Sequence, residues 1–335
     1  MTGAEALARA LVDRGIRRVF SHAGGTISRL LDAADREGIR VVVATQESQA
    51  VHMAQGAYRV TGRPQVAFVT SGPGVTNAVT GIADAYYDQD AVVLICGQVA
   101  TTSRRGGRPI RQLGFQETPT VEIMRPICKA AVLVDFAPDL GPTVRDALEL
   151  AVQPRPGPVV LDVPMDVQIA EAGNQDGGYS RLQFRHRPGW RVSMAEAEDL
   201  LAALRRASWP VVVAGRGCLT ATRQLRQFSE RFGLSVVTSL AGVGAMPSKH
   251  PNYDGILGHT GHKIANEVVA GADFILALGT RLDVRQTGSD NDWRRGKTVA
   301  TVDYSHEELN FGRIRPDFFV CFPVKGWLEW ANAHA

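Results

Sequence analysis

Short apolar runs rich in β-branched residues alternate with stretches of helical spacing along the first half of this chain. The runs predict buried strands at residues 17–20, 41–44, 65–70, 92–96 and 159–163. Between them, residues 48–61 and 74–87 carry small and apolar side chains at helical intervals. Strands that alternate with helices are typical of a parallel sheet covered by helices on both faces.

A second series of the same kind follows a stretch of low periodicity. The chain has 335 residues, which exceeds the length at which one hydrophobic core usually stops growing. Residues 170–190 are rich in Gly, Asn, Gln, Arg and Pro and predict a linker. The expected fold is α/β, with two successive doubly wound parallel-sheet domains at 1–170 and 191–335, joined by a linker at 171–190. In the second domain we expect helices at 194–206, 222–232 and 264–270, and strands at 210–214, 235–238, 274–278 and 298–302.

Charge and cysteine patterns exclude several classes of protein. The 37 basic and 34 acidic residues are interspersed, so no nucleic-acid partner is expected. The one local run, the arginines from Arg104 to Arg111, indicates a solvated loop. The four cysteines form no CxxC pair and indicate neither a zinc site nor disulfides. His259 and His262 have no carboxylate or cysteine companions nearby, which argues against a metal site. No run has membrane-spanning length and the start does not resemble a signal peptide, so we expect a cytoplasmic protein with no membrane partner.

Glu47 is the acidic residue that best fits a catalytic role. It follows the predicted strand at 41–44 and opens a helix, at the sheet edge where functional groups normally lie. A glutamate in the first turn of a helix is also favoured by the helix dipole and needs no further role. Glu47 alone therefore does not decide between these interpretations.

Two glycine-containing loops leave the same expected edge of the sheet. The loop TSGPGVTN, residues 70–77, follows one strand and begins a helix, which exposes backbone N–H groups. It could admit a flat heterocycle, hold a phosphate, or only turn the chain, because a single glycine-rich loop is a weak signal. The loop SHAGGT, residues 21–26, follows the first strand and has two glycines that leave room for another group.

Several long motifs, in order, resemble the acetolactate-synthase family of thiamine-diphosphate enzymes. The first domain is similar to the family's pyrimidine-binding domain through residues 47–62, TSGPGVTN, GIADAYYDQDAVVLICGQV, GFQETPTVEIMRPICK and RPGPVVLDVPMDVQ. The second is similar to its central domain through GRGC, TSLAGVGAMP, GILGHTGH, LALGTRLDVRQTG and VDYSHEEL. This resemblance covers nearly the whole chain.

The resemblance implies a role for each matching residue. Glu47 would hydrogen-bond the N1′ nitrogen of the cofactor's aminopyrimidine, which requires a carboxyl group in a nonpolar pocket. The cofactor would act as an electron sink while a small 2-oxo acid loses carbon dioxide and adds to a second carbonyl. Gln116 would share the catalytic site, Phe115 would line the substrate pocket, and the pyrimidine ring would be lined by Gly24, Gly25, Thr70, Pro73 and Asn77.

This chain departs from the family pattern in both domains. His22 and Ala23 stand where the family carries an aromatic residue and a proline, so the substrate pocket is altered, although a lone loop histidine is more often structural. The family's central domain binds FAD, but Ser305 and Phe322-Pro323 replace its usual residues, and a structural domain is expected rather than a flavin site. Possible FAD contacts match Arg155, Gly215, Arg216, Gly217, Gly258, His259, Thr260, Gly261, Gly279, Arg281, Asp283 and Arg285.

The diphosphate end of the cofactor has no expected anchor in these residues. The family holds Mg²⁺ and the diphosphate with a Gly-Asp-Gly segment and a following Asn, and no such pair occurs here. We therefore expect the Glu-bearing subunit of a split carboligase or 2-oxo-acid decarboxylase, with Mg²⁺ held by a separate diphosphate-binding subunit in a two-plus-two heterotetramer. The alternatives are a non-catalytic regulatory module that binds a partner or nucleotide, and a fragment of a longer protein.

Overall fold

The computed structural model describes residues 1–173, 178–182, 193–289, 293–305 and 310–334. The chain divides into two compact units, Met1–His186 and Arg187–Ala335, and each is described by itself. The division falls within the predicted linker at 171–190, of which residues 174–177 and 183–190 lie outside the described part of the chain.

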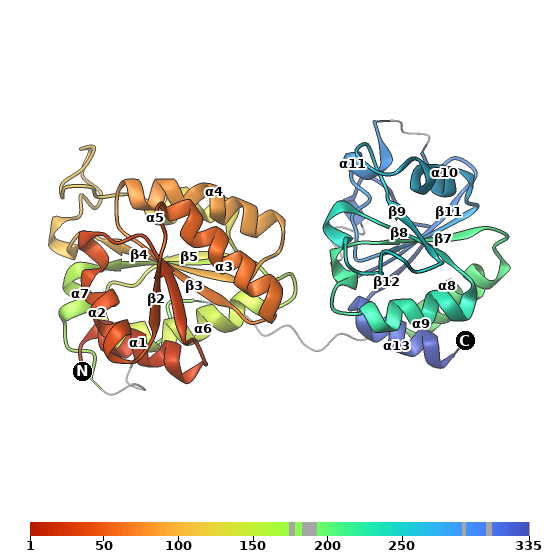
Figure 1. Cartoon of the computed structure of the whole chain (residues 1–335). Helices are drawn as coiled ribbons and strands as arrows, with labels where there is room; N and C mark the ends of the chain where they lie inside the picture. Colours follow the sequence, from red (N-terminus) through yellow and green to blue (C-terminus); the bar gives the residue numbers. More distant parts are fainter. Residues whose placement is uncertain (174–177, 183–192, 290–292, 306–309, 335) are drawn as a thin grey trace. The chain divides into compact units, whose positions relative to one another are not determined.

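The first unit is built on a six-stranded parallel sheet (Figure 1). Its strands, which pair in the order β2-β1-β3-β4-β6-β5, are β1 (Arg18–Ser21), β2 (Arg40–Val43), β3 (Gln65–Val69), β4 (Val92–Gln98), β5 (Ala130–Leu133) and β6 (Val159–Pro164). The chain runs from β1 outward to β2 and then returns to the other side of β1 with β3. The direction of winding therefore reverses between β1 and β3, where open α/β sheets place their ligands.

Helices cover both faces of this sheet, as the alternating pattern predicts (Figure 1). One face packs against α1 (Gly3–Asp13), α2 (Ser28–Arg36), α6 (Leu140–Val152) and α7 (Met165–Ile169). The other face packs against α3 (Glu47–Thr61), α4 (Pro73–Tyr87) and α5 (Thr120–Met124). The central strands β3 and β4 are fully buried, because apolar side chains are covered on both sides.

Local sequence explains where the helices of the site begin and end. Helix α4 begins with Pro73 at its first position, where a missing N–H costs nothing. Helix α3 ends at Gly62, which adopts the left-handed conformation of a C-terminal cap. Helix α1 begins with a capping box in which Thr2 and Glu5 exchange hydrogen bonds between side chain and backbone.

The second unit is also a six-stranded parallel sheet, paired in the order β12-β11-β10-β7-β8-β9 (Figure 1). Its strands are β7 (Pro210–Ala214), β8 (Ser235–Thr238), β9 (Tyr253–Ile256), β10 (Phe274–Leu278), β11 (Thr298–Asp303) and β12 (Phe318–Cys321). One face packs against α8 (Met194–Arg206), α9 (Thr222–Phe232) and α13 (Val324–Ala333), and the other against α10 (Lys263–Gly271). A short helix, α11 (Val284–Thr287), follows β10.

The predicted fold class is confirmed, and the strands predicted from sequence are present with ends that shift by a residue or two. The strand expected at 41–44 is Arg40–Val43, and the one expected at 65–70 ends at Val69. β5, β9 and β12 were not predicted; they are short, partly exposed strands at the edges of the two sheets, and β9 also has a register shift beside Gly255. Within the described part of the chain, every helix is too short or too polar to cross a membrane.

Candidate functional site

Three loops leave the carboxyl edge of the first sheet beside the point where its winding reverses. They follow β1, β2 and β3 at residues 22–25, 44–46 and 70–72. Because β1 pairs in parallel with both β2 and β3, all three loops emerge at the same edge, as the sequence predicts. This arrangement brings the predicted cofactor-binding loops and the start of helix α3 together.

Glu47 is the first residue of α3 and its side chain is buried, with an exposed fraction of 6%. The Asn77 Nδ2 atom donates a hydrogen bond to Glu47 Oε2 over 3.0 Å. No other hydrogen bond to this carboxylate occurs in the described part of the chain, so Oε1 can meet a further donor. The positive end of the helix dipole also favours a carboxylate at this position.

A glycine lets helices α3 and α4 approach closely enough for this hydrogen bond. A Cβ atom at Gly81 would lie 2.6 Å from Val51 Cβ and 3.2 Å from the Ser48 carbonyl oxygen. No side chain fits at that distance. Gly81 therefore sets the spacing of the two helices one turn after Asn77, and this spacing places Asn77 against Glu47.

Thr26 ties the loop after β1 to the loop after β3. The Thr26 and Thr70 hydroxyls are 2.9 Å apart, and Thr26 Oγ1 accepts a hydrogen bond from the Ser71 amide over 2.9 Å. A Cβ atom at Gly24 would lie only 2.4 Å from Thr70 Cβ. Gly24 thus serves close packing against Thr70, while the position of a Cβ at Gly25 is open to solvent.

Gly74, a buried residue in the first turn of α4, lies close to both Thr70 and Glu47. A Cβ atom there would lie 2.7 Å from Thr70 Cγ2 and 3.6 Å from Glu47 Oε1. Any side chain at residue 74 would thus fill the space beside the carboxylate. The Glu47 carboxylate therefore borders the backbone of Gly74 and not a side chain.

The segment at residues 112–118, here called the Gln116 loop, is held against the turn at Gly72. The Gly72 amide donates to Thr118 Oγ1 over 2.8 Å. Gln116 has a φ of 62°, unusual for a residue with a side chain, and a Cβ at Gly72 would lie 2.8 Å from Gln116 Cβ. Phe115 points its ring to the surface with 85% exposure.

Glu117 binds both ends of the arginine-containing segment at residues 105–113. Its two carboxylate oxygens accept hydrogen bonds from the Arg105 and Leu113 amides, each over 2.8 Å. These bonds fold residues 105–113 back on themselves. Arg108 and Arg111 are exposed, as predicted for a solvated loop, whereas Arg104 and Arg105 are half-buried.

In the first unit, the residues that depart from the family pattern lie in the loop after β1. The His22 ring nitrogen Nδ1 is 3.0 Å from the Ala44 carbonyl oxygen, so this histidine links two of the three loops. Ala23 is exposed, as is Pro73 at the start of α4. His22 therefore has a structural partner.

Sequence reasoning missed a buried acid beneath the Gln116 loop. Asp162 lies in the buried strand β6 with 1% exposure, and its Oδ2 accepts a hydrogen bond from Gln98 Nε2 over 3.0 Å. Burial raises the pKa of Asp162 to about 7, while hydrogen bonds from Gln98 and Thr120 act to lower it. A charged residue inside the apolar run VVLDVP was the signal that could have identified it.

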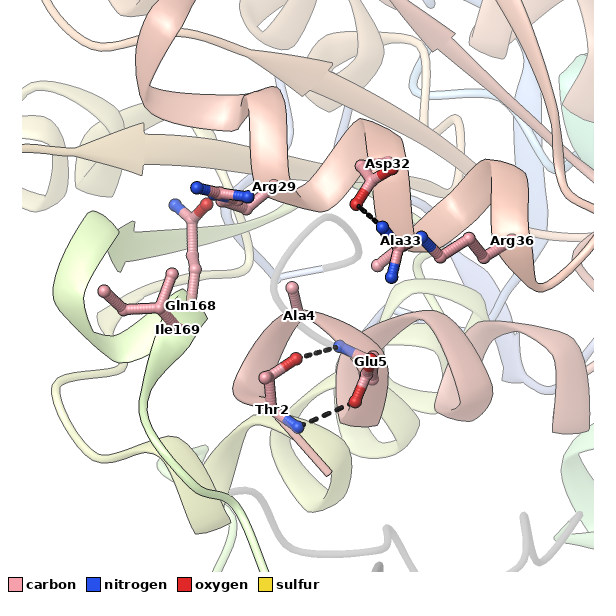
Figure 2. A pocket seen from close by; sticks show the side chains of 9 residues that line it. All are labelled: Thr2, Ala4, Glu5, Arg29, Asp32, Ala33, Arg36, Gln168 and Ile169. Carbon is pink, nitrogen blue, oxygen red and sulfur yellow. Dashed lines mark hydrogen bonds and ion pairs between the residues drawn. The ribbon is translucent and has the colours of Figure 1, made fainter.

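A hollow of about 130 Å³ lies between α1, α2 and α7, on the face of the first sheet opposite α3 and α4 (Figure 2). Arg29, Asp32 and Arg36 point toward it from α2, and Asp32 pairs with Arg36 over 3.0 Å. Gln168 links this hollow to the loops by donating to the Thr26 carbonyl oxygen over 2.8 Å. Its mixed charges select no particular ligand, and it contains none of the predicted site residues.

The glycines of the predicted FAD path in the second unit are occupied by internal packing. A Cβ at Gly215 would lie 2.1 Å from the Gly279 carbonyl oxygen, and one at Gly279 would lie 2.6 Å from Gly217 Cα. A Cβ at Gly258 would lie 2.3 Å from the Arg285 carbonyl oxygen. Close contact between the loops after β7 and β10 is therefore a sufficient reason for Gly215 and Gly279, and contact with α11 is one for Gly258.

The other residues of that path do not share one cavity. A hollow of about 520 Å³ is lined by Gly258 and His259, whereas Arg281 lines a separate hollow of about 10 Å³. Asp283 caps α11 by accepting from the Arg285 amide and lies 3.7 Å from the Arg281 guanidinium. Arg155 belongs to the first unit. In the described part of the chain, no group of three His, Cys, Asp or Glu residues could hold a metal ion.

Comparisons with known proteins match both units of the chain. The family model described as "Thiamine pyrophosphate enzyme, N-terminal TPP binding domain" matches residues 1–123, and "Thiamine pyrophosphate enzyme, central domain" matches residues 197–329. The acetolactate synthase isozyme 3 large subunit of Escherichia coli is 38% identical over 307 residues, which are 90% of this chain and 52% of that protein.

A plant relative extends the match over almost the whole chain. The chloroplastic acetolactate synthase 2 of Nicotiana tabacum is 34% identical over 341 aligned residues, which cover 99% of this chain and 49% of the relative. The chain spans about half the length of the curated relatives that it matches.

Proposed function

Because the chain belongs to the thiamine pyrophosphate enzyme family, with acetolactate synthases as relatives, we propose that it forms the pyrimidine-binding half of a thiamine diphosphate site. The observation that carries this proposal is the buried Glu47 carboxylate, which is held by Asn77 and lies beside the backbone of Gly74. The proposed reaction class is carboligation or decarboxylation of a small 2-oxo acid.

In this proposal Glu47 shares a proton with the N1′ nitrogen of the cofactor's pyrimidine ring. Asn77 fixes Oε2 and leaves Oε1 to face the ring. Low exposure keeps water from competing for the proton, and an acid close to a weakly basic nitrogen can transfer it in either direction. The bound cofactor supplies an electron sink for decarboxylation.

Other residues shape the site around this proton. Thr26 and Thr70 hold two loops together, and Gly24 and Gly74 let the backbone pack closely around Thr70. Gln116 and Phe115 are proposed to lie at the reacting end of the cofactor. His22 and Ala23 are proposed to line the substrate pocket.

We further propose that a diphosphate-binding domain on a partner subunit completes the site and holds Mg²⁺, in a heterotetramer with two copies of each chain. Two exposed large apolar side chains on segments that border the site support this, Val43 at the end of β2 and Phe115 in the Gln116 loop. For the second unit we propose a structural role without FAD, because its glycines are explained by packing. A cytoplasmic location is part of this proposal.

Glu47→Gln tests the proposed function. The amide keeps the size of the side chain but cannot exchange the proton, so 2-oxo-acid turnover by the chain with a diphosphate-binding partner, Mg²⁺ and thiamine diphosphate should fall by about 10²-fold or more. Glu198→Gln, an exposed position on α8, is the matched control and should retain full turnover. Equal activity of Glu47→Gln and the parent chain would contradict the proposal.

Calorimetry separates this function from that of a non-catalytic regulatory module. We expect thiamine diphosphate to bind the mixture of the chain and its partner more tightly than either alone, and size measurements should detect the two-plus-two assembly. Absence of cofactor binding in both the chain and the mixture would favour the regulatory alternative. Binding to the Glu47→Gln mixture with loss of turnover would assign Glu47 to proton transfer.

A further inference from the structure

Thr118 is the centre of a buried chain of hydrogen bonds beneath the Gln116 loop. Its hydroxyl accepts from the Gly72 amide over 2.8 Å and donates to the Gln116 carbonyl oxygen over 3.1 Å. Its own carbonyl oxygen accepts from Gln98 Nε2 over 2.8 Å. One buried residue thus joins the turn after β3, the Gln116 loop and the end of β4.

Gln98 and Asp162 continue this chain of hydrogen bonds from Thr118 into the sheet. Gln98 is fully buried at the end of β4, and both amide hydrogens are used because Nε2 donates to Thr118 O and to Asp162 Oδ2. The Gln98 Oε1 atom accepts from the Val99 amide over 3.0 Å, which fixes the orientation of the amide group. Asp162 lies on the neighbouring strand β6, so the support belongs to the sheet itself.

The backbone at Gln116 needs this support. A positive φ is costly for a residue with a Cβ atom, and such a conformation persists only where surrounding contacts hold it. Gln116 also packs directly against Gly72, where no larger residue would fit. Loss of the Thr118 hydroxyl would release both the Gly72 amide and the Gln116 carbonyl from their shared partner.

We propose that Thr118, Gln98 and Asp162 are positioning residues that fix Gln116 at the reacting end of the cofactor site. They act through the Gln116 loop and touch neither cofactor nor substrate. This inference rests on the proposed function only for what Gln116 faces, since the chain of hydrogen bonds holds the loop without any ligand.

The first test measures hydrogen exchange of the purified chain without cofactor. Thr118→Val keeps the side-chain volume but removes the hydroxyl, so the hydrogen-bonded amides of Gly72, Leu113 and Glu117 should exchange about five to ten times faster. Thr118→Ser keeps the hydroxyl and should restore the slow exchange. Ser21→Ala removes a buried hydroxyl that donates to the Phe68 carbonyl, and should leave exchange of the Gln116 loop unchanged.

Gln98→Leu is a second variant with the same expected effect, because it removes the donor to the Thr118 carbonyl oxygen. If the Thr118→Val chain does not fold, the hydrogen exchange of Gln98→Leu tests the inference in its place. Wild-type exchange rates in the Gln116 loop of a folded Thr118→Val or Gln98→Leu chain would overturn the inference.

The second test measures kinetics in the complete assembly. For Thr118→Val we expect kcat to fall about tenfold with the affinity for thiamine diphosphate unchanged, and Thr118→Ser should recover kcat. A loss of cofactor affinity with kcat retained would overturn the positioning role. Fast loop exchange in Thr118→Val together with full turnover in Glu47→Gln would instead reject the proposed function and leave the structural support of the loop intact.

Discussion

The Asn77 side chain donates to the Glu47 carboxylate over 3.0 Å and so joins the second turn of α4 to the first residue of α3. Glu47 is buried, and this is the only hydrogen bond to its side chain within the described residues. A carboxylate at such a position depends strongly on its one partner.

Asn77→Leu should destabilise the first unit by about 1–3 kcal/mol, because the buried carboxylate loses its donor. Urea unfolding of the chain, followed by circular dichroism, measures this change. Thr76→Val alters the neighbouring residue of α4, whose hydroxyl bond is exposed, and should change the unfolding free energy by less than about 0.5 kcal/mol. Equal stability of both variants would show that the Asn77–Glu47 bond contributes little.

Alanine at two helical glycines should have opposite effects on stability. Gly81→Ala places a Cβ 2.6 Å from Val51 Cβ, so α3 and α4 must move apart and we expect a loss of about 1–3 kcal/mol. Gly56→Ala meets no atom within 4 Å and should stabilise α3 by about 0.5–1 kcal/mol. Thermal unfolding of both variants beside the parent chain gives the comparison. A stabilising Gly81→Ala would mean that the helices do not touch there.

Gly72→Ala should displace the Gln116 loop. Gly72 has a φ of 65°, and a Cβ there would lie 2.8 Å from Gln116 Cβ, so both backbone strain and a side-chain clash oppose the substitution. We expect turnover of the complete assembly to fall at least about tenfold. Gly62→Ala is a control with a similar φ of 66° but no neighbouring atom, and should affect stability without affecting turnover.

Asp162 should make stability fall as the pH rises from about 4 to about 7. Burial raises its pKa to about 7, so in this range the folded chain keeps a proton that the unfolded chain has already lost. The stabilisation is complete below the unfolded pKa and is lost as the pH rises through the folded value, at a slope of about 1.4 kcal/mol per pH unit. Arg104, which favours the charged form, and Glu122, which opposes it, also act on this group.

Asp162→Asn should remove this contribution, because the amide does not titrate and can still accept from Gln98. Urea unfolding of both chains between pH 4.5 and pH 8, with all other sites shared, isolates the difference as about 1 kcal/mol or more across the range. Parallel stability profiles for the two chains would show that Asp162 is charged throughout.

The sequence predicted most strands and helices of the first unit and singled out Glu47 as its candidate catalytic acid. Parallel strands with fully apolar runs, such as 92–96, leave little alternative to a buried position. Glu47 was singled out by its place after the strand at 41–44 together with the motifs that resemble the family. The supports of the site were not predicted, since Thr118 and Gly72 are 46 positions apart and their hydrogen bond follows no local pattern. In the second unit, Gly215 and Gly279 matched a flavin path by motif, whereas the structure gives each a packing reason.

The bond between Thr118 and the Gly72 amide also limits how this protein can be redesigned. The Gln116 loop and the turn after β3 are both hydrogen-bonded to Thr118. Thr118 is in turn hydrogen-bonded to Gln98 of β4, which binds Asp162 of β6. A chimera that takes residues 112–118 from a relative must also take the matching turn at Gly72 and the residues at positions 98 and 162. Without them, the transplanted loop would lack the hydrogen bonds that hold it.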